Sequence, residues 1–346
     1  FTTACSSKTE NTTTTSQDKD TFTYAINSDP SSTNPINVSD RWGLTMTNMI
    51  YSPLIRVEGD GSLVNELAES TELAKDGLSL TVNLKKGIKW SDGQDFTADD
   101  VVFTYETKAK KENGNFKSLW INDKPITVEK KDDHTVVFKF PEPSAAAANN
   151  IATETYIIPK HIYGNVSDFS VKDLQEKPVG TGPYKLVENK RGEYIKFEAN
   201  ENYYKGKPNV KNVVLRVIQS ADTAKVALQK GEIDASYVLP TDIKDLDTNK
   251  LDVYSYSENR IGYLGLNTKT NELKDVKVRQ AILYAIDKKE LTQDFLKGHV
   301  TPADGAFLDS SIYSSGTFAN KQYQPEMTKK LLEEAGYKTK NADGIL

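Results

Sequence analysis

The chain has 346 residues, more than a single small domain needs and enough for two or three domains. Hydrophobic residues make up 37% of it and charged residues 27%, as in ordinary globular proteins. The formal net charge is -5 and no basic block occurs, so the charge pattern argues against nucleic-acid binding. No apolar run approaches the roughly 18 residues that a membrane-crossing helix needs, so any attachment to a membrane requires a tether.

The only cysteine is Cys5, in the sequence FTTACSSK, so a disulfide within the chain is impossible. The run Thr3-Ala4-Cys5 is similar to the end of a bacterial lipobox, although Thr2 replaces the usual Leu, and the apolar part of such a signal peptide would lie upstream. Residues 6–20 contain no apolar side chain, and such a segment cannot offset the entropy lost on ordering. We therefore expect lipidation at Cys5 and a disordered tether over residues 1–20, with a cysteine placed there by chance as the alternative.

The first ordered elements are a predicted strand over residues 21–29 and an amphipathic helix over 41–51, joined by a loop rich in Pro, Ser, Asp and Asn. The segment from Leu67 to Glu106 then predicts a strand, a turn and a helix. Thr97 and Asp100 have the spacing of a capping box at the start of that helix. The strand is indicated by alternating apolar residues at Leu78, Leu80, Val82 and Leu84.

The middle of the chain alternates strands with a helix. Residues 126–140 predict a hairpin, and VGTGPYKL at 179–186 predicts a turn where a strand enters a sheet. This glycine run lacks the Lys-Ser/Thr ending of a phosphate loop, which argues against nucleotide binding. The further predictions are strands at 184–189, 193–198, 212–219 and 232–238, and a helix at 221–230 between Ser220 and Gly231. This order of strand, helix and strand indicates an α/β sheet.

The last part of the chain predicts one strand and two helices. The strand is expected over 261–267, and the helices over 275–287 and 325–335. The final residues, NADGIL, predict a turn that opens into a further strand.

No arrangement of residues points to catalysis or to a metal. None of His134, His161 and His299 lies at metal-ligand spacing from another ligand, and no G-x-S-x-G nucleophile motif occurs. We therefore expect a binding protein with no catalytic residue, no metal and no cofactor. Two other classes stay open: a secreted hydrolase with paired carboxylates, which turnover of peptides or glycosides would reveal, and a surface adhesin or signalling receptor, which would bind a macromolecule tightly.

Eight motifs carry a resemblance to a known family. One is GIKWSDGQDFTADDVVFTYE at residues 87–106. The others, in chain order, are SDPSSTNPINVSD (28–40), MIYSPLIRVEGDGSLVNELAES (49–70), IIPKHIY (157–163), VGTGPYKL (179–186), NENYYKGKPNV (200–210), SADTAKVALQKGEIDAS (220–236) and GYLGLNTKTNELKDVKVRQAILYAIDKKEL (262–291). Together they span nearly the whole chain and resemble the family 5 extracellular solute-binding proteins, the oligopeptide-, dipeptide- and nickel-binding lipoproteins of ABC importers.

This resemblance implies an α/β, two-lobed periplasmic-binding-protein-like fold of type II, with an extra small α+β subdomain in the first lobe. Residues 21–58 and 174–260 would form the ligand-binding first lobe, and 59–173 the inserted subdomain. Residues 261–346 would form a second lobe whose C-terminal part is missing, because family members are longer.

The resemblance also implies a function. The protein would be no enzyme but a monomeric substrate-binding lipoprotein that captures peptides between two lobes and delivers them to the permease of an ABC importer. It would be lipid-anchored at the extracellular face of the bacterial cell membrane, in the periplasm where an outer membrane exists. A nickel chelate, a sugar or a pheromone peptide as the ligand stays open.

An extended peptide held between lobes pairs with the protein through backbone groups, as in strand addition. The resemblance places the loop after the first strand and the lobe-crossing strand at this ligand, with simple turn formation as the alternative for the loop. If the crossing strand is regular, the side chains of Tyr263 and Asn267 face one way and that of Arg260 the other. The family's carboxylate for the peptide amine would lie in the missing C-terminal part. The candidate ligand-binding residues are Asn27, Ser28, Asp29, Ser31, Ser32, Arg260, Tyr263 and Asn267.

Overall fold

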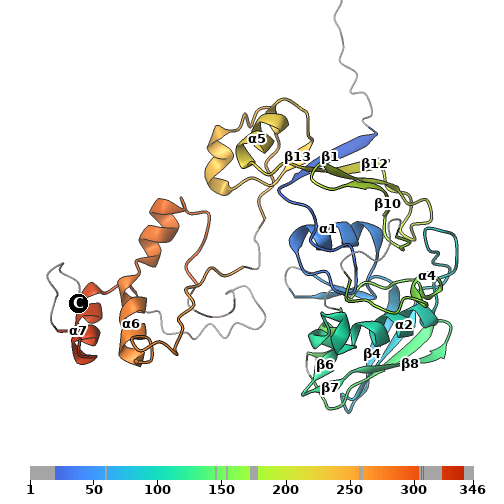
Figure 1. Ribbon diagram of the computed structural model, residues 1–346, viewed down its shortest axis with the longest axis horizontal. Coiled ribbons are helices and arrows are strands. Elements are labelled where there is room, and N and C mark those ends of the chain that lie inside the picture. Colours follow the sequence, from blue (N-terminus) through green and yellow to red (C-terminus); the bar gives the residue numbers. More distant parts are fainter. Residues whose placement is uncertain are drawn as a thin grey trace, which may run out of the picture. The chain divides into compact units, whose positions relative to one another are not determined.

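The computed structural model describes residues 20–58, 61–144, 146–152, 155–171, 178–256, 260–303, 305, 307 and 322–338 (Figure 1). The chain divides into two compact units. The first unit comprises Phe1–Arg56 and Asn65–Tyr237, and the second comprises Val57–Val64 and Val238–Leu346. The family resemblance predicts the corresponding boundary after Arg260. The expected tether, with Cys5, and the expected final strand lie outside the described residues.

The strands are β1 (Thr21–Ile26), β2 (Ile55–Val57), β3 (Leu63–Asn65), β4 (Ala68–Leu73), β5 (Ser79–Leu84), β6 (Trp120–Ile121), β7 (Lys124–Pro125), β8 (Thr127–Asp132), β9 (Thr135–Lys139), β10 (Tyr184–Lys190), β11 (Tyr194–Ala199), β12 (Asn212–Val217) and β13 (Ala235–Ser236). The α-helices are α1 (Arg41–Ile50), α2 (Ala98–Lys108), α3 (Ala147–Ala152), α4 (Lys160–Tyr163), α5 (Ala221–Gln229), α6 (Val276–Ala285) and α7 (Pro325–Glu334).

The first unit contains a five-stranded sheet in the order β10-β11-β12-β1-β13. β1 runs parallel to both of its neighbours, β12 and β13, whereas β10, β11 and β12 pair antiparallel. The crossover from β12 through α5 to β13 confirms the predicted strand–helix–strand unit, with β1 between its strands. Ser220 caps α5, and Gly231 follows it with a φ of 70°. β13 is shorter than the predicted strand 232–238.

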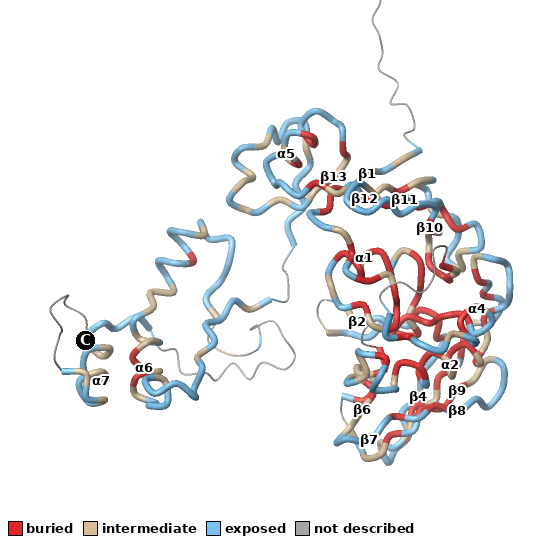
Figure 2. Tube along the Cα trace, in the orientation of Figure 1, coloured by how far each residue is buried: buried red, intermediate tan, exposed pale blue. Residues whose placement is uncertain are grey.

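α1 lies between this sheet and the remaining part of the first unit (Figure 1). Its apolar residues Trp42, Met46 and Ile50 pack in one core with residues of β1, β11 and β12. The same core contains Tyr51 and Tyr163, whose hydroxyl oxygens lie 2.8 Å apart, and burial raises the pKa of Tyr163 to about 12. The buried residues of the described chain gather mainly in this unit (Figure 2).

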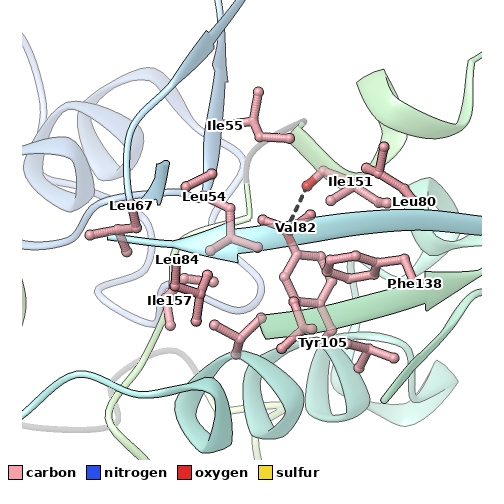
Figure 3. Packing of buried hydrophobic residues seen from close by; sticks show 14 of the residues in the cluster. Leu54, Ile55, Leu67, Leu80, Val82, Leu84, Tyr105, Phe138, Ile151 and Ile157 are labelled. Carbon is pink, nitrogen blue, oxygen red and sulfur yellow. Dashed lines mark hydrogen bonds between the residues drawn. The ribbon is translucent and has the colours of Figure 1, made fainter. Parts of the chain in front are cut away.

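A four-stranded antiparallel sheet in the order β4-β5-β9-β8 forms the inserted part, and α2 packs on β8 and β9. The predicted hairpin over 126–140 is confirmed as β8 and β9. Its core includes Val82, Tyr105 and Phe138 (Figure 3). The Tyr105 hydroxyl donates to the carbonyl oxygen of Ile151 at 2.9 Å, and its ring meets that of Phe138 edge-on at a centroid distance of 4.7 Å.

The buried carboxylate of Asp100 joins three segments of this inserted part. It completes the predicted capping box by accepting from the backbone N–H of Thr97 at 3.0 Å. It also accepts from the indole of Trp90 at 3.4 Å and from the backbone N–H of Lys160 at 2.8 Å. Burial raises the pKa of Asp100 despite these bonds. The carboxylate therefore fixes the turn, the start of α2 and the start of α4 together.

Gly180 and Gly182 connect the inserted part to α1. The backbone N–H of Gly182 donates to the carbonyl of Ile50 at 2.8 Å, and the N–H of Ser91 donates to the carbonyl of Gly180 at 2.9 Å. A Cβ on Gly180 would overlap the Ile50 carbonyl, and one on Gly182 would lie 2.6 Å from the Met49 carbonyl oxygen. The glycines of the predicted turn are thus required for close approach to the end of α1.

Glu66 forms a second connection within the first unit. Its side chain is 4% exposed, and it accepts from the Tyr204 hydroxyl at 2.7 Å and pairs with Lys205 and Arg56. Burial alone would raise the pKa of Glu66, but the bonds from Lys205 and Tyr204 and the charges of Lys205 and Arg56 outweigh it and lower the pKa. The segment around 204 is thereby fixed to the start of β4.

In the second unit α6 and α7 pack against each other. The hydroxyl of Thr328 donates to the Ala281 carbonyl at 3.1 Å, and Lys277 pairs with Glu334 at 3.1 Å. The prediction of a strand over 261–267 is wrong, because these residues lie outside any helix or strand. A strand needs a neighbour to satisfy its N–H and C=O groups, and no sheet strand among the described residues comes from the chain after Ser236.

Replacing Asp100 by Asn should lower the free energy of unfolding by about 1–3 kcal/mol, because the amide has one acceptor oxygen and its NH₂ would face a buried N–H donor. Asp99→Asn is the matched control. The side chain of Asp99, next to Asp100 in the chain, is 48% exposed and pairs with Lys130 at the surface. Loss of this surface ion pair should lower the free energy of unfolding by at most about 0.5 kcal/mol. Denaturation followed by tryptophan fluorescence reports on the first unit, which contains Trp42, Trp90 and Trp120. Equal losses in the two variants would contradict the role assigned to Asp100.

Candidate functional site

The candidate site lies at the carboxyl ends of the parallel strands β1 and β13. In open α/β sheets ligands bind outside the carboxyl ends of the strands. The loop over residues 27–32 leaves β1 at this edge, and Tyr237 follows β13 directly. The start of α1 contacts both segments. The site in the first unit is therefore defined by the loop 27–32, the residues 40–42 and Tyr237.

Two side chains at the start of α1 hold the loop. The indole N–H of Trp42 donates to Asn27 Oδ1 at 2.6 Å. Asp40, the N-cap of α1, accepts from the Gly43 N–H at 3.0 Å and from the hydroxyl of Ser31 at 2.5 Å. Asp40 thus satisfies an unpaired amide of the first helical turn and positions the loop at the same time.

Other bonds shape the loop from within and from the turn between β10 and β11. Both carboxylate oxygens of Asp29 accept from the backbone N–H of Gly192, at 3.0 and 2.9 Å, in the turn between β10 and β11. The buried hydroxyl of Ser32 donates to Asn37 Oδ1 at 3.0 Å and accepts from the N–H of Asn34 at 3.1 Å. These hydrogen bonds fix the conformation of the loop, and Ser28 is exposed to solvent.

A cation and aromatic rings meet beside the loop. The guanidinium carbon of Arg41 lies 4.9 Å from the ring centroid of Tyr237 and 5.5 Å from that of Trp42. The ring of Trp42 in turn meets that of Tyr24, from β1, at a centroid distance of 6.1 Å. This arrangement offers flat apolar faces and hydrogen-bond donors at the edge of the sheet, which suits ligand binding more than catalysis.

The structure places the predicted site residues in both units. Asn27, Ser28, Asp29, Ser31 and Ser32 come together in the first unit, and Arg260, Tyr263 and Asn267 belong to the second. Tyr263 is 86% exposed. Asn267 forms a turn: its side-chain oxygen accepts from the Lys269 N–H at 3.1 Å. Because residues 261–267 form no strand, the predicted shared face of Tyr263 and Asn267 no longer follows.

Sequence reasoning missed Asp40, Arg41, Trp42 and Tyr237. Part of the signal was available, since an Asp directly before an amphipathic helix predicts an N-cap. The contact of Arg41 with Tyr237 had no local signal, because the two residues are far apart in the chain. In the part of the chain that the structure describes, no group of three His, Cys, Asp or Glu residues is placed to hold a metal ion. Within those same residues, no helix has the length and hydropathy to cross a bilayer.

Comparison with known proteins places this geometry in a family. The model of the bacterial extracellular solute-binding proteins, family 5 middle, matches residues 62–346. Oligopeptide-binding protein AppA of Bacillus subtilis is 36% identical over 331 residues, which cover 92% of this chain and 60% of AppA. The solved structure of AppA in complex with a nonapeptide matches with a TM-score of 0.82 and 34% identity, covering 94% of this chain and 66% of AppA's chain.

Two further solved structures agree. The ABC transporter substrate-binding protein CtaP of Listeria monocytogenes has a TM-score of 0.84 and 34% identity, covering 92% of this chain and 65% of CtaP. NikZ of Campylobacter jejuni, in complex with Ni(L-His), has a TM-score of 0.79 and 30% identity, covering 94% of this chain and 65% of NikZ. The chain thus spans about two thirds or less of these relatives. The predicted two-lobed α/β fold is confirmed by these structures, and the chain belongs to family 5 of the bacterial extracellular solute-binding proteins.

Proposed function

We propose that the protein is the substrate-binding component of an ABC importer, and that it captures peptides and delivers them to the membrane permease. The observation that carries the proposal is the similarity, over most of this chain, to an oligopeptide-binding protein whose structure holds a nonapeptide. The similarity to CtaP, an ABC transporter substrate-binding protein, supports the link to an importer. The protein acts by binding and release and catalyses no reaction.

The loop over residues 27–32 supplies one side of the peptide site. Its backbone is held by Asp40, Trp42 and Gly192, so it can offer N–H and C=O groups to an extended peptide at little entropic cost. Recognition through backbone groups tolerates many peptide sequences, because those groups are common to all residues. Arg260, Tyr263 and Asn267, which belong to the second unit, are further proposed ligand-binding residues.

A nickel chelate is the second candidate ligand, favoured by the similarity to NikZ with bound Ni(L-His). A chelate brings its own ligands for the metal, so its binding does not require a cluster of metal-ligating residues in the protein. Calorimetric titration of the complete protein with a pool of random nonapeptides, and separately with nickel–histidine, distinguishes the two. Saturable heat with the peptides alone supports the proposal, and heat with nickel–histidine alone overturns it.

The protein works as a monomer at the outer face of the bacterial cell membrane. Family 5 proteins are extracellular, and Cys5 with the polar run after it supplies a lipid attachment site and a tether.

Replacing Tyr263 by Ala should weaken nonapeptide binding by roughly tenfold to a hundredfold, the size of one aromatic anchor in an interface. Calorimetry of the complete protein measures this change, with the fold checked by circular dichroism. Tyr254→Ala is the matched control, because Tyr254 is equally exposed at 85% but belongs to none of the family motifs. Equal affinity in the wild type and in Tyr263→Ala would remove Tyr263 from the site.

Replacing Cys5 by Ala in the full precursor should release the protein into the medium, because no thiol remains for the lipid. Fractionation of cells and medium, with detection of the protein, measures the distribution. The neighbouring Ser6→Ala keeps the cysteine and should stay with the cells. Retention of Cys5→Ala on cells at the wild-type level would refute the lipid anchor.

A further inference from the structure

Three consecutive residues at the start of α1 contact two segments that are far apart in the chain, the loop over residues 27–32 and Tyr237. Asp40 binds the loop at Ser31, and Trp42 binds the same loop at Asn27. Arg41, between them, lies against Tyr237. Side chains of consecutive helical residues diverge by about 100°, so one turn of a helix can face several neighbours.

Tyr237 has a particular place in the chain. It is the last residue of the first unit, and the chain enters the second unit at Val238. It follows the two-residue strand β13, which pairs with β1 only at Tyr24 and Ala25. So short a strand fixes the exit of the chain weakly, and the contact with Arg41 adds a restraint directly at the exit.

The start of α1 packs closely on the loop over residues 27–32. Gly43 is buried, and a Cβ there would lie 2.4 Å from Val38 Cγ2, 2.6 Å from Asp40 Oδ2 and 3.1 Å from the carbonyl oxygen of Ser32. The backbone of the helix at Gly43 therefore lies directly against the loop. A displacement of the loop over 27–32 must then move residues 40–42, or break the bonds that Asp40 and Trp42 make.

We infer that Arg41 is a positioning residue that couples the ligand loop over 27–32 to the point where the chain leaves the first unit at Tyr237. This inference rests on the proposed function, because it gives the coupling its purpose. A peptide bound to the loop acts on residues 40–42 through the bonds of Asp40 and Trp42, and through the Arg41–Tyr237 contact it restrains the segment that enters the second unit. Arg41 thereby favours the arrangement of the exit segment that retains the ligand.

The coupling can be measured without any ligand, by hydrogen exchange of the complete protein. On the exit side the reporters are the amides of Asp242 and Leu246, which donate to the carbonyls of Leu239 and Ile243 at 2.9 and 3.0 Å. On the loop side the reporter is the amide of Ser31, which donates to Asp40 at 3.2 Å. Loss of a partly exposed cation–π contact should raise local opening about two- to fivefold.

Both Arg41→Met and Tyr237→Leu should therefore raise exchange about two- to fivefold at the loop and at the exit segment. Amides of β5, in the inserted sheet, should keep their wild-type rates and exclude general destabilisation. Tyr237→Phe keeps the ring face and should behave as the wild type. Lys111→Met is the matched control: it removes a cation 4.4 Å from the Trp120 ring centroid, outside the site, and should change neither reporter.

The inference is overturned if Tyr237→Leu leaves the Ser31 amide at its wild-type rate, or if Lys111→Met changes the loop as Arg41→Met does. A second experiment measures the binding kinetics of the complete protein, with the random nonapeptide pool as the probe. Arg41→Met should raise the dissociation rate about two- to fivefold and leave the association rate unchanged. If the wild type binds no nonapeptide, the proposed function fails, while the exchange result still decides the coupling.

Discussion

The position of α1 depends on a close contact at its carboxyl end. Gly180 and Gly182 pack against the carbonyl of Ile50, where no side chain fits. The same segment bonds to Ser91 in the turn of the inserted part, and Asn200 Nδ2 donates to the Gly182 carbonyl at 2.8 Å. The helix is thus fixed at one end by backbone contacts, and its other end carries Asp40, Arg41 and Trp42 to the ligand loop. One end of α1 therefore contacts the scaffold and the other end contacts the candidate site.

Two buried carboxylates, Asp100 and Glu66, connect segments of this scaffold, and their pKa values are shifted in opposite directions. Burial raises the pKa of Asp100, because the loss of hydration outweighs the N–H bonds that lower it. Glu66 has two cations and a hydroxyl as partners, so its pKa is lowered, and its charged form stabilises the fold. The stabilisation by Glu66 is present above its unfolded pKa and is lost as the pH falls through its folded pKa. Burial of the Asp100 carboxylate costs free energy, but its hydrogen bonds fix three segments in one arrangement.

Local patterns predicted those elements whose stability is local. The capping box of Thr97 and Asp100, the Ser220 cap of α5 and the hairpin of β8 and β9 all follow from short-range rules and are confirmed. The pattern failed at residues 261–267, since alternation of residues does not provide a neighbouring strand. The contacts of Arg41 with Tyr237 and of Glu66 with Lys205 depend on the folded chain, and no spacing in the sequence reveals them. The ligand loop was predicted from family resemblance, but its attachment to α1 was not.

The proposed function requires that the loop over residues 27–32, held by the start of α1, contacts the ligand. A crystal structure of the complete protein with a bound nonapeptide tests this claim most directly. We predict peptide atoms within hydrogen-bond distance of the backbone or side chains of this loop, with the bonds from Trp42 to Asn27 and from Ser31 to Asp40 intact. A nonapeptide bound without any contact to residues 27–32 would contradict the account.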